Sequence, residues 1–186
     1  MLHFYLSSGA PTRRAYLVRG YATAIMAFVI GPGARAPDFE LPDQDGQAVR
    51  LSALRGRTIV LYFYPRADTP GCTTQACSIR DREADYTAAG VKVIGVSPDP
   101  VAKVKKFHDK KDLNFTLLAD ADHAVCDLYG VWVQKSMYGK TYMGAQRATF
   151  IVDGDGCIRH VIPKASPKTH DDEVLKALAD LPSSAA

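Results

Sequence analysis

The chain has 186 residues, of which 47% are hydrophobic and 23% charged, so it has the length of one domain and enough apolar residues for a sizeable core, which excludes a disordered or fibrous chain. Its formal net charge of +3 originates in the first 37 residues, which hold four arginines and no acid, against 19 basic and 20 acidic residues in the remainder. The nearly neutral remainder argues against a nucleic-acid partner, and no apolar run is long enough to span a bilayer.

The first segment in chain order is an extension, residues 1–30, that contains Arg, Ser and Tyr but no acid. This composition fits an organellar transit peptide, a vector-derived remnant or a start codon assigned too far upstream, and all three remain open. A secretory signal fits less well, because the apolar run at residues 22–30 lacks a good cleavage signature. Met26 is an alternative start, so we expect the extension to be dispensable and residues 31–186 to form one domain.

The next feature is a buried strand that leads into a helix. Residues 58–64 are apolar, β-branched and aromatic, and Pro65 forbids their continuation as a central strand. The turn and helix-start residues 68–71 then place Cys72 in the opening turn of a helix. Free backbone N–H groups and the helix dipole favour a thiolate there, and the pKa of such cysteines falls from about 8.5 to roughly 3.5–7.5. The pattern predicts a nucleophilic thiol.

Cys77 lies five residues after Cys72 on the same predicted helix. Helix geometry puts the two residues about 140° apart around the axis, with their Cα atoms roughly 8 to 9 Å apart. A disulfide needs a Cα separation of about 4.4 to 6.8 Å, so the two thiols cannot bond while the helix is intact. A static structural disulfide is therefore the weaker interpretation, and a catalytic pair or two unrelated thiols remain.

The rest of the chain alternates between strand and helix patterns. Apolar spacing extends the Cys72 helix to Gly90. After it, the pattern predicts strands at 91–96 and 114–118 and helices at 100–112 and 122–129. The chain then ends in a predicted hairpin, with strands 146–152 and 157–162 around a turn at 153–156, and a last helix at 170–181. Strands that alternate with helices predict an α/β fold.

Two further cysteines and the scattered histidines do not form a metal-binding pattern. Cys126 lies in an apolar helical pattern and Cys157 follows a turn, so we interpret both as incidental. A structural zinc site would need paired ligands, which the spacing of the Cys and His residues does not provide. The acidic turn at 153–156 lacks the downstream ligands of a calcium loop. We therefore expect no metal.

The run Tyr-Pro-x-x-x-Thr-Pro-Gly-Cys-Thr-x-x-x-Cys at residues 64–77 resembles the active site of the peroxiredoxins. A second cysteine five positions after the first is similar to the peroxiredoxin Q, or bacterioferritin-comigratory-protein, branch. The likeness extends to segments 36–43, 93–99 and 147–153 and covers about residues 34–180. A start at Met26 would also resemble the beginning of a complete peroxiredoxin Q.

The resemblance implies a thioredoxin-like α/β fold with an N-terminal extension hairpin and a central mixed sheet flanked by helices. It also implies an antioxidant thiol peroxidase that needs no cofactor. Cys72 would be the peroxidatic cysteine, oxidised by the hydroperoxide to a sulfenic acid, and Cys77 would condense with it to an intramolecular disulfide. Thr69 would hydrogen-bond the peroxide and the thiolate, Arg147 would hold the thiolate and polarise the O–O bond, and Pro65 would shield the pocket.

The same resemblance implies a hydroperoxide substrate, recycling by thioredoxin or a similar dithiol donor, and a monomer. The pair of thiols is typical of a reducing compartment, so we expect a cytoplasmic location. Two other functions stay open. A thiol–disulfide oxidoreductase normally needs two residues between its cysteines, and here there are four. A redox sensor or holdase would expose surface when the Cys72 helix unwinds, a role that is compatible with peroxidase activity.

Taken alone, Thr69 is typical of a helix cap and Arg147 is typical of a solvated strand edge.

Overall fold

The structure is a computed structural model that describes residues 30–137 and 139–181. The extension expected at residues 1–30, and with it Met26, lies outside the described residues except for Ile30. Within the described ranges, no helix is long and apolar enough to cross a membrane.

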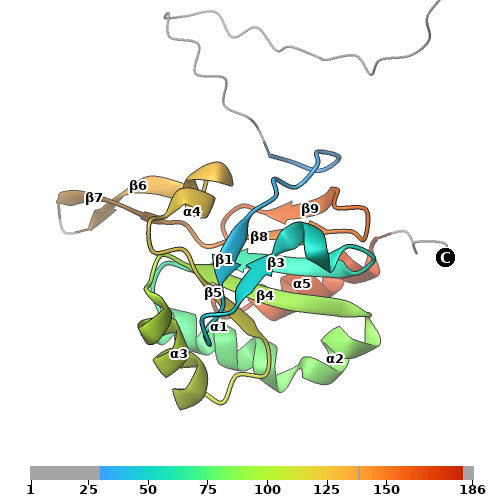
Figure 1. Ribbon diagram of the computed structural model, residues 1–186, viewed down its shortest axis with the longest axis horizontal. Coiled ribbons are helices and arrows are strands. Elements are labelled where there is room, and N and C mark those ends of the chain that lie inside the picture. The colour runs from blue at the N-terminus through green and yellow to red at the C-terminus, as the bar shows by residue number, and fades with distance from the viewer. Residues whose placement is uncertain (1–29, 138, 182–186) are drawn as a thin grey trace, which may run out of the picture.

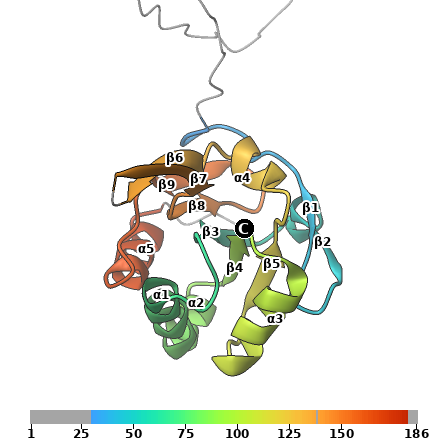
Figure 2. The same cartoon turned by 90° about the vertical axis from the view of Figure 1, so that its left-hand side faces the viewer.

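The central sheet contains five strands, and their order across it is β5–β4–β3–β8–β9. In that order the strands span Thr116–Ala119, Val91–Ser97, Thr58–Phe63, Ala148–Val152 and Ile158–Ile162. β3, β4 and β5 run parallel, whereas β8 is antiparallel to β3 and β9 is antiparallel to β8. The sheet is therefore mixed, and other elements cover both of its faces (Figure 1 and Figure 2).

One face of the sheet packs against helices α1, α2, α3 and α5, which span Pro70–Asp81, Glu83–Ala88, Val101–Lys110 and His170–Ala179. The other face packs against the N-terminal segment, the short 3₁₀ helix η1 (Leu51–Leu54) and α4 (Ala124–Leu128). The N-terminal segment contains the antiparallel pair β1 (Glu40–Pro42) and β2 (Ala48–Arg50). The expected thioredoxin-like α/β fold with a central mixed sheet flanked by helices is confirmed.

Strand β3 supplies both halves of the core, because successive side chains of a strand point to opposite faces. Ile59, Leu61 and Phe63 join the cluster on the α4 side, whereas Val60 and Tyr62 join the cluster under the four helices. All five side chains are at most 2% exposed. This double burial explains why the strand is a continuous apolar run, which made it predictable from the sequence.

The single long helix expected from Cys72 to Gly90 is wrong, because the chain forms two helices there. The helix α1 ends at Asp81 and α2 begins at Glu83, with Arg82 between them at φ −108° and ψ 23°. The Arg82 guanidinium bonds Asp85 at 2.8 Å on α2 and Asp172 at 2.5 Å on α5. These ion pairs favour a break at this residue, and apolar spacing alone cannot reveal it.

A second difference is a hairpin that the sequence did not predict. β6 (Trp132–Met137) and β7 (Lys140–Ala145) form an antiparallel two-stranded sheet of their own, which projects from the body in Figure 1. Tyr142 and Met143 are 44% and 51% exposed. Because neither face of β7 is fully buried over these residues, the strand lacks the alternation of apolar and polar residues by which strands are recognised.

At the start of α5, His170 is only 1% exposed, and its Nε2 atom lies 2.7 Å from the Thr149 hydroxyl of β8. Burial, helped by the positive charge of Arg147, lowers the pKa of His170 from 6.5 to about 4, against a smaller opposite effect of Asp171. The folded protein therefore holds this ring neutral at physiological pH.

The free energy of unfolding should consequently decrease as the pH falls from 6.5 toward 4. In this window the unfolded chain binds a proton at His170 that the folded chain does not bind, which costs about 2 kcal/mol between pH 7 and pH 5. Urea unfolding at the two pH values measures the effect. In a His170→Gln variant, which retains a hydrogen-bonding side chain but does not titrate, the difference between the two pH values should shrink by about this amount. An unchanged difference would contradict a buried neutral histidine.

Candidate active site

The site begins at the turn between β3 and α1. Asp68 has a positive φ of 59°, and the following Thr69 is the N-terminal cap residue of α1 with extended backbone angles. Pro70 occupies the first helical turn, where its missing N–H is not needed. The first helical hydrogen bond runs from Thr73 N to Thr69 O at 2.8 Å. Cys72 thus lies in the first turn of α1, as the sequence predicts, and its side chain is 2% exposed.

A guanidinium group from a distant part of the sequence contacts the Cys72 sulfur. Arg147 immediately precedes β8, and its Nη2 atom donates to Cys72 Sγ at 3.2 Å. Its Nη1 atom donates to the side-chain oxygen of Gln75, one turn further along α1. Gln75 is 1% exposed, so this carbonyl is a buried acceptor. The two bonds fix the guanidinium plane against α1 and aim one of its donors at sulfur.

Thr69 and Pro65 flank the turn but do not bond the sulfur. The Thr69 hydroxyl donates to Arg66 O at 3.0 Å, and Pro65 is half-buried two residues after the end of β3. The turn is also tied to β4 and α3, because Ala67 N donates at 2.6 Å to the buried carboxylate of Asp99. The hydroxyl of Thr69, three residues before Cys72, is thus held at the entrance to α1.

Cys77 is half-buried on α1, which is helical through both cysteines, and both are free thiols. The C-terminal end of this helix is also held by bonds to other elements. Arg80 Nη1 donates to Lys111 O at 2.5 Å, and Arg80 O accepts from Asn114 at 3.2 Å. Arg82, just beyond the helix, pairs with acids of α2 and α5. The helix is therefore held at both ends, by Arg147 near Cys72 and by Arg80 and Arg82 at and beyond its C-terminal end.

Aromatic side chains close the site on the sheet side. Tyr62 and Tyr64, each 1% exposed, lie in the same core cluster as Cys72, with their ring centroids 5.6 Å apart. Burial raises the pKa of both phenols above the usual value, and the negative charge of a Cys72 thiolate acts in the same direction. Both hydroxyls therefore stay protonated, and the sulfur has a dry, uncharged surface beneath it.

The two remaining cysteines lie away from Cys72 and Arg147. Cys126 on α4 is fully buried, and its backbone N–H donates at 2.7 Å to Asp120. Burial, together with Asp120, raises the pKa of its thiol, so it is a poor nucleophile. Cys157 is half-buried beside β9 and pairs with Arg35 in a β-bridge. Among the described residues, no group of three His, Cys, Asp or Glu side chains could hold a metal ion.

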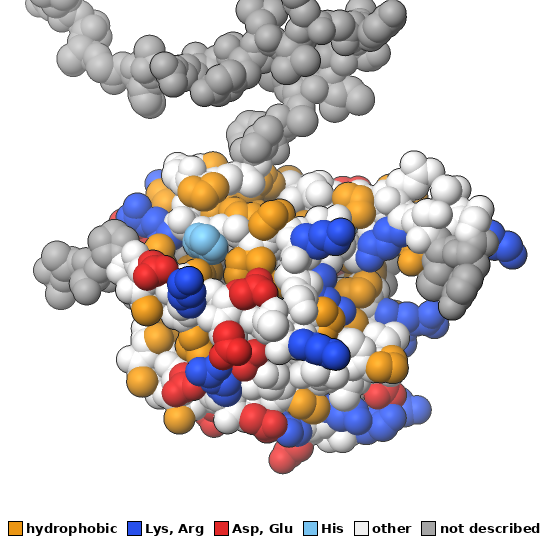
Figure 3. Space-filling view, turned by 180° about the vertical axis from the view of Figure 1, so that it is seen from behind, with side chains coloured by type: hydrophobic (Ala, Val, Ile, Leu, Met, Phe, Trp, Pro, Cys, Tyr) orange, Lys and Arg blue, Asp and Glu red, His pale blue; other side chains and the backbone are white. Residues whose placement is uncertain are grey.

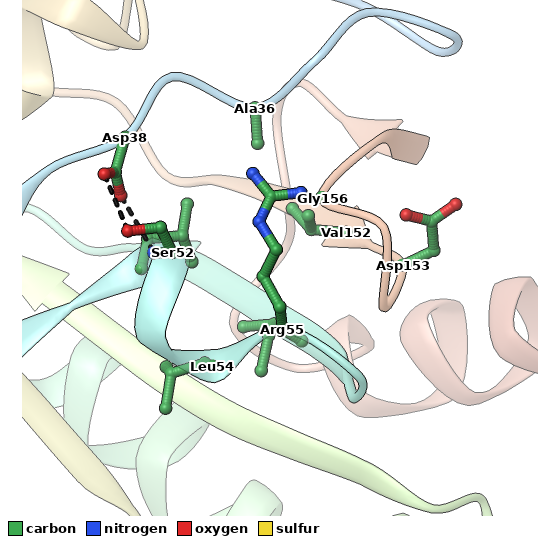
Figure 4. A pocket seen from close by; sticks show the side chains of 10 residues that line it. Ala36, Asp38, Ser52, Leu54, Arg55, Val152, Asp153 and Gly156 are labelled. Atoms are coloured by element: carbon green, nitrogen blue, oxygen red, sulfur yellow. Dashed lines mark hydrogen bonds between the residues drawn. The ribbon is translucent and has the colours of Figure 1, made fainter.

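A pocket elsewhere on the molecule does not belong to this site. Figure 4 shows it between η1 and the β8–β9 turn, with Arg55 pointing into it beside Gly156. Asp38 accepts bonds from the Ser52 N–H and hydroxyl, both at 2.8 Å. The pocket is also lined by Ile59, near the start of β3, whereas Cys72 follows the end of that strand. The pocket and the thiol therefore lie at opposite ends of the sheet.

Sequence reasoning missed two residues of this region. Gln75 follows Cys72 by three positions, so its place on the same helix face could have been inferred from helical spacing. Lys135 lies on β6, and Coulomb interactions with Arg147 and Cys72 affect its pKa. No signal for Lys135 was available, because the hairpin that carries it was not predicted.

The chain matches known proteins over most of its length. The model of the AhpC/TSA family matches residues 32–161. The chain is 49% identical over 148 residues to Peroxiredoxin Bcp of Escherichia coli (strain K12), which covers 80% of this chain and 95% of that protein. It is 51% identical over 127 residues to the putative peroxiredoxin Rv2521 of Mycobacterium tuberculosis, which covers 68% of this chain and 81% of that protein.

Solved structures agree with these relatives. Peroxidoxin BcpB from Mycobacterium tuberculosis superimposes with a TM-score of 0.74 at 38% identity, over 83% of this chain and 99% of that one. The bacterioferritin comigratory protein of Xanthomonas campestris gives a TM-score of 0.72 at 35% identity, over 76% and 90%. The chain therefore belongs to the AhpC/TSA family, and within it to the bacterioferritin-comigratory-protein branch of the peroxiredoxins, which are thiol peroxidases.

Proposed function

We propose that Cys72 is the residue that reacts with hydrogen peroxide and organic hydroperoxides. The observation that carries this assignment is the 3.2 Å contact between Arg147 Nη2 and Cys72 Sγ in the first turn of α1. A fixed guanidinium donor and free N–H groups at a helix start both favour negative charge on sulfur. The Xanthomonas campestris relative was described for its alkyl peroxide reduction activity, which supports organic hydroperoxides as substrates.

In the first step the Cys72 thiolate attacks the terminal oxygen of the hydroperoxide. A bond from sulfur to oxygen forms, the O–O bond breaks, and the leaving oxygen takes a proton to give water or an alcohol. Cys72 is oxidised to a sulfenic acid. Charge moves from sulfur to the leaving oxygen in this step, so donors of Arg147 that bond both atoms would lower the barrier.

Thr69 and Pro65 would shape the space in which the peroxide binds. The Thr69 hydroxyl can turn from Arg66 O, which it bonds at 3.0 Å, to accept a hydrogen bond from the hydroperoxide O–H. Pro65 has no N–H and would present only its ring to the entrance, which limits access of water to the sulfenic acid. Both roles rest on position beside α1 together with the family resemblance.

The second step would join Cys72 to Cys77. The Cys77 thiolate attacks the sulfenic sulfur, water leaves, and an intramolecular disulfide forms. Because both residues lie on the intact helix α1, the first turns must unwind before the sulfurs meet. The anchors at Arg80 and Arg82 support an opening confined to the N-terminal half of the helix.

A dithiol protein such as thioredoxin would then reduce the disulfide by thiol–disulfide exchange, which returns two electrons to the chain. Free thiols of this kind persist in reducing compartments, so we place the protein in the cytoplasm. We further propose that it acts as a monomer in antioxidant defence. Residues 31–186 would form the single peroxiredoxin domain, and the family match begins at residue 32.

Oxidation of the reduced protein with one equivalent of hydrogen peroxide should form the Cys72–Cys77 disulfide. Trypsin cleaves after Arg66 and Arg80, so both cysteines fall in peptide 67–80, which should rapidly lose two hydrogens in mass spectrometry. A Cys77→Ser variant should stop at the Cys72 sulfenic acid, with one turnover retained and turnover with thioredoxin lost.

A Cys72→Ser variant should consume no peroxide. Cys157→Ser is the control, because Cys157 is half-buried like Cys77, and this variant should behave as the parent protein. A crosslink from Cys72 to a peptide with Cys126 or Cys157 would contradict the resolving role of Cys77. Undiminished turnover in Cys72→Ser would contradict the peroxidatic role of Cys72.

Replacement of Arg147 by Lys should slow the oxidation of Cys72 by roughly 10²- to 10³-fold. The charge is retained, but the planar fork that bonds Cys72 and Gln75 together is lost. Stopped-flow fluorescence with hydrogen peroxide measures this rate. Arg159→Lys, at an exposed arginine paired with Asp153 on the same sheet, is the matched control and should stay within about twofold. Equal rates in the two variants would exclude a role for the guanidinium geometry.

Helix stability should set the rate of disulfide formation. Thr74 is exposed in the middle of α1, so Thr74→Ala and Thr74→Gly differ by about 1 kcal/mol in helix stability without a change in the core. The Gly variant should resolve about fivefold faster than the Ala variant, and the Ala variant should be more readily overoxidised to the sulfinic acid. Rapid quench and mass spectrometry report both species. The same pair at Lys176, exposed on α5, should leave resolution unchanged, and a reversed order at Thr74 would refute the coupling.

A further inference from the structure

Lys135 reaches from the β6–β7 hairpin toward the segment that carries Arg147. Its Nζ atom donates at 2.5 Å to the carbonyl of Ala145, which lies two residues before Arg147. The side chain passes over Gly144, where an added Cβ would lie 3.7 Å from Lys135 Cδ. The ammonium is thus held on the inner side of the hairpin, although its strand is part of a projecting two-stranded sheet (Figure 1).

The charge of Lys135 is not neutralised by a neighbouring acid. Within residues 30–137 and 139–181, neither Lys135 nor Arg147 forms an ion pair with a carboxylate. By contrast, Lys103, Lys105 and Lys110 of α3 each pair with an aspartate. The cation of the hairpin therefore differs from these three lysines of α3.

Lys135 and the reactive sulfur both lie beside the segment of Arg147, Lys135 through its bond to Ala145 O and Cys72 through its bond from the guanidinium. Burial lowers the pKa of Lys135, the nearby Arg147 lowers it further, and the Cys72 thiolate opposes both effects. Two cations thus act on one region around the sulfur. In Figure 3 blue side chains also predominate in the half of that view from which the hairpin projects, while red ones gather in the other half.

We propose that Lys135 makes the site prefer organic hydroperoxides that carry a carboxylate. This inference rests on the proposed role of Cys72. Lys135 attracts the remote carboxylate, while the hydroperoxide end reacts at sulfur. The reaction balances as for any hydroperoxide: sulfur gains the terminal oxygen, the O–O bond breaks, and the leaving oxygen takes a proton. The product is the corresponding hydroxy acid with its carboxylate unchanged, and Lys135 takes no part in bond breaking.

The size of the effect follows from Coulomb's law at a partly solvated site. One cation about 7 Å from a carboxylate, at an effective dielectric constant of roughly 40, changes the rate by about three- to tenfold. Added salt should reduce this factor, because the ammonium is only partly buried. A neutral hydroperoxide of the same shape should not respond to the charge.

The test compares 4-hydroperoxy-4-methylpentanoate with its methyl ester, two probes that differ only in the charge of the remote group. Stopped-flow rates of Cys72 oxidation are measured for the parent protein and for Lys135→Gln, which keeps an N–H donor for Ala145 O but removes the charge. We expect the carboxylate probe to slow three- to tenfold and the ester to stay within twofold. Lys135→Arg should restore the preference, and 0.5 M NaCl should weaken it in the parent protein.

Lys140→Gln is the matched control, since Lys140 is an exposed lysine of the same hairpin. It should leave both rates unchanged. An unaltered ratio of carboxylate to ester rates in Lys135→Gln would overturn the inference, and so would an equal decrease for both probes, which would mean that Lys135 acts on the thiolate itself. Failure of the Cys72 assignment is separate, because Cys72→Ser would then still consume both probes.

Discussion

The contact between Arg147 and Cys72 joins two segments that are 75 residues apart, and the site depends on it. It exists because β3 and β8 lie side by side in the middle of the sheet. Their antiparallel register pairs Phe63 with Ala148, so the chain entering β8 at Arg147 lies beside the chain leaving β3. The helix that follows β3 then presents its first turn to the guanidinium. A shift of this register by one residue would turn the side chains of β8 to the opposite face.

The sequence predicted the parts of the molecule in which local pattern and burial agree. The run at β3, the Pro70 helix start and the hairpin of β8 and β9 all have strong local signals, so their positions were right to within two residues. The break at Arg82 depends on acids of α5, and the β6–β7 hairpin has exposed residues without alternation. Neither has a local signal. The proximity of Arg147 to Cys72 was expected only through family resemblance, since no periodicity relates residues so far apart.

Two requirements meet at α1. A dry surface of Tyr62 and Tyr64 beneath the sulfur strengthens the bond from Arg147, which favours a well-packed helix. The disulfide that we propose between Cys72 and Cys77 needs that packing to be released. The contacts beyond Cys77 reconcile the two, because Arg80 and Arg82 hold the end of the helix independently of the Arg147 bonds at its start. Local opening then breaks the contacts of the first turns alone and leaves α2 and the sheet in place.

The β6–β7 hairpin has its own hydrogen-bonded pairing, and of its described side chains Trp132 and Ala145 belong to the core cluster on its side of the sheet. Its outer residues are consequently free to vary during evolution with little penalty for the stability of the domain. The peroxide chemistry and the selection of substrates by charge then reside in separate units of the same chain. Relatives with this fold could acquire new substrate preferences by substitutions at the outer positions of β6 and β7 while the reactive centre stays fixed.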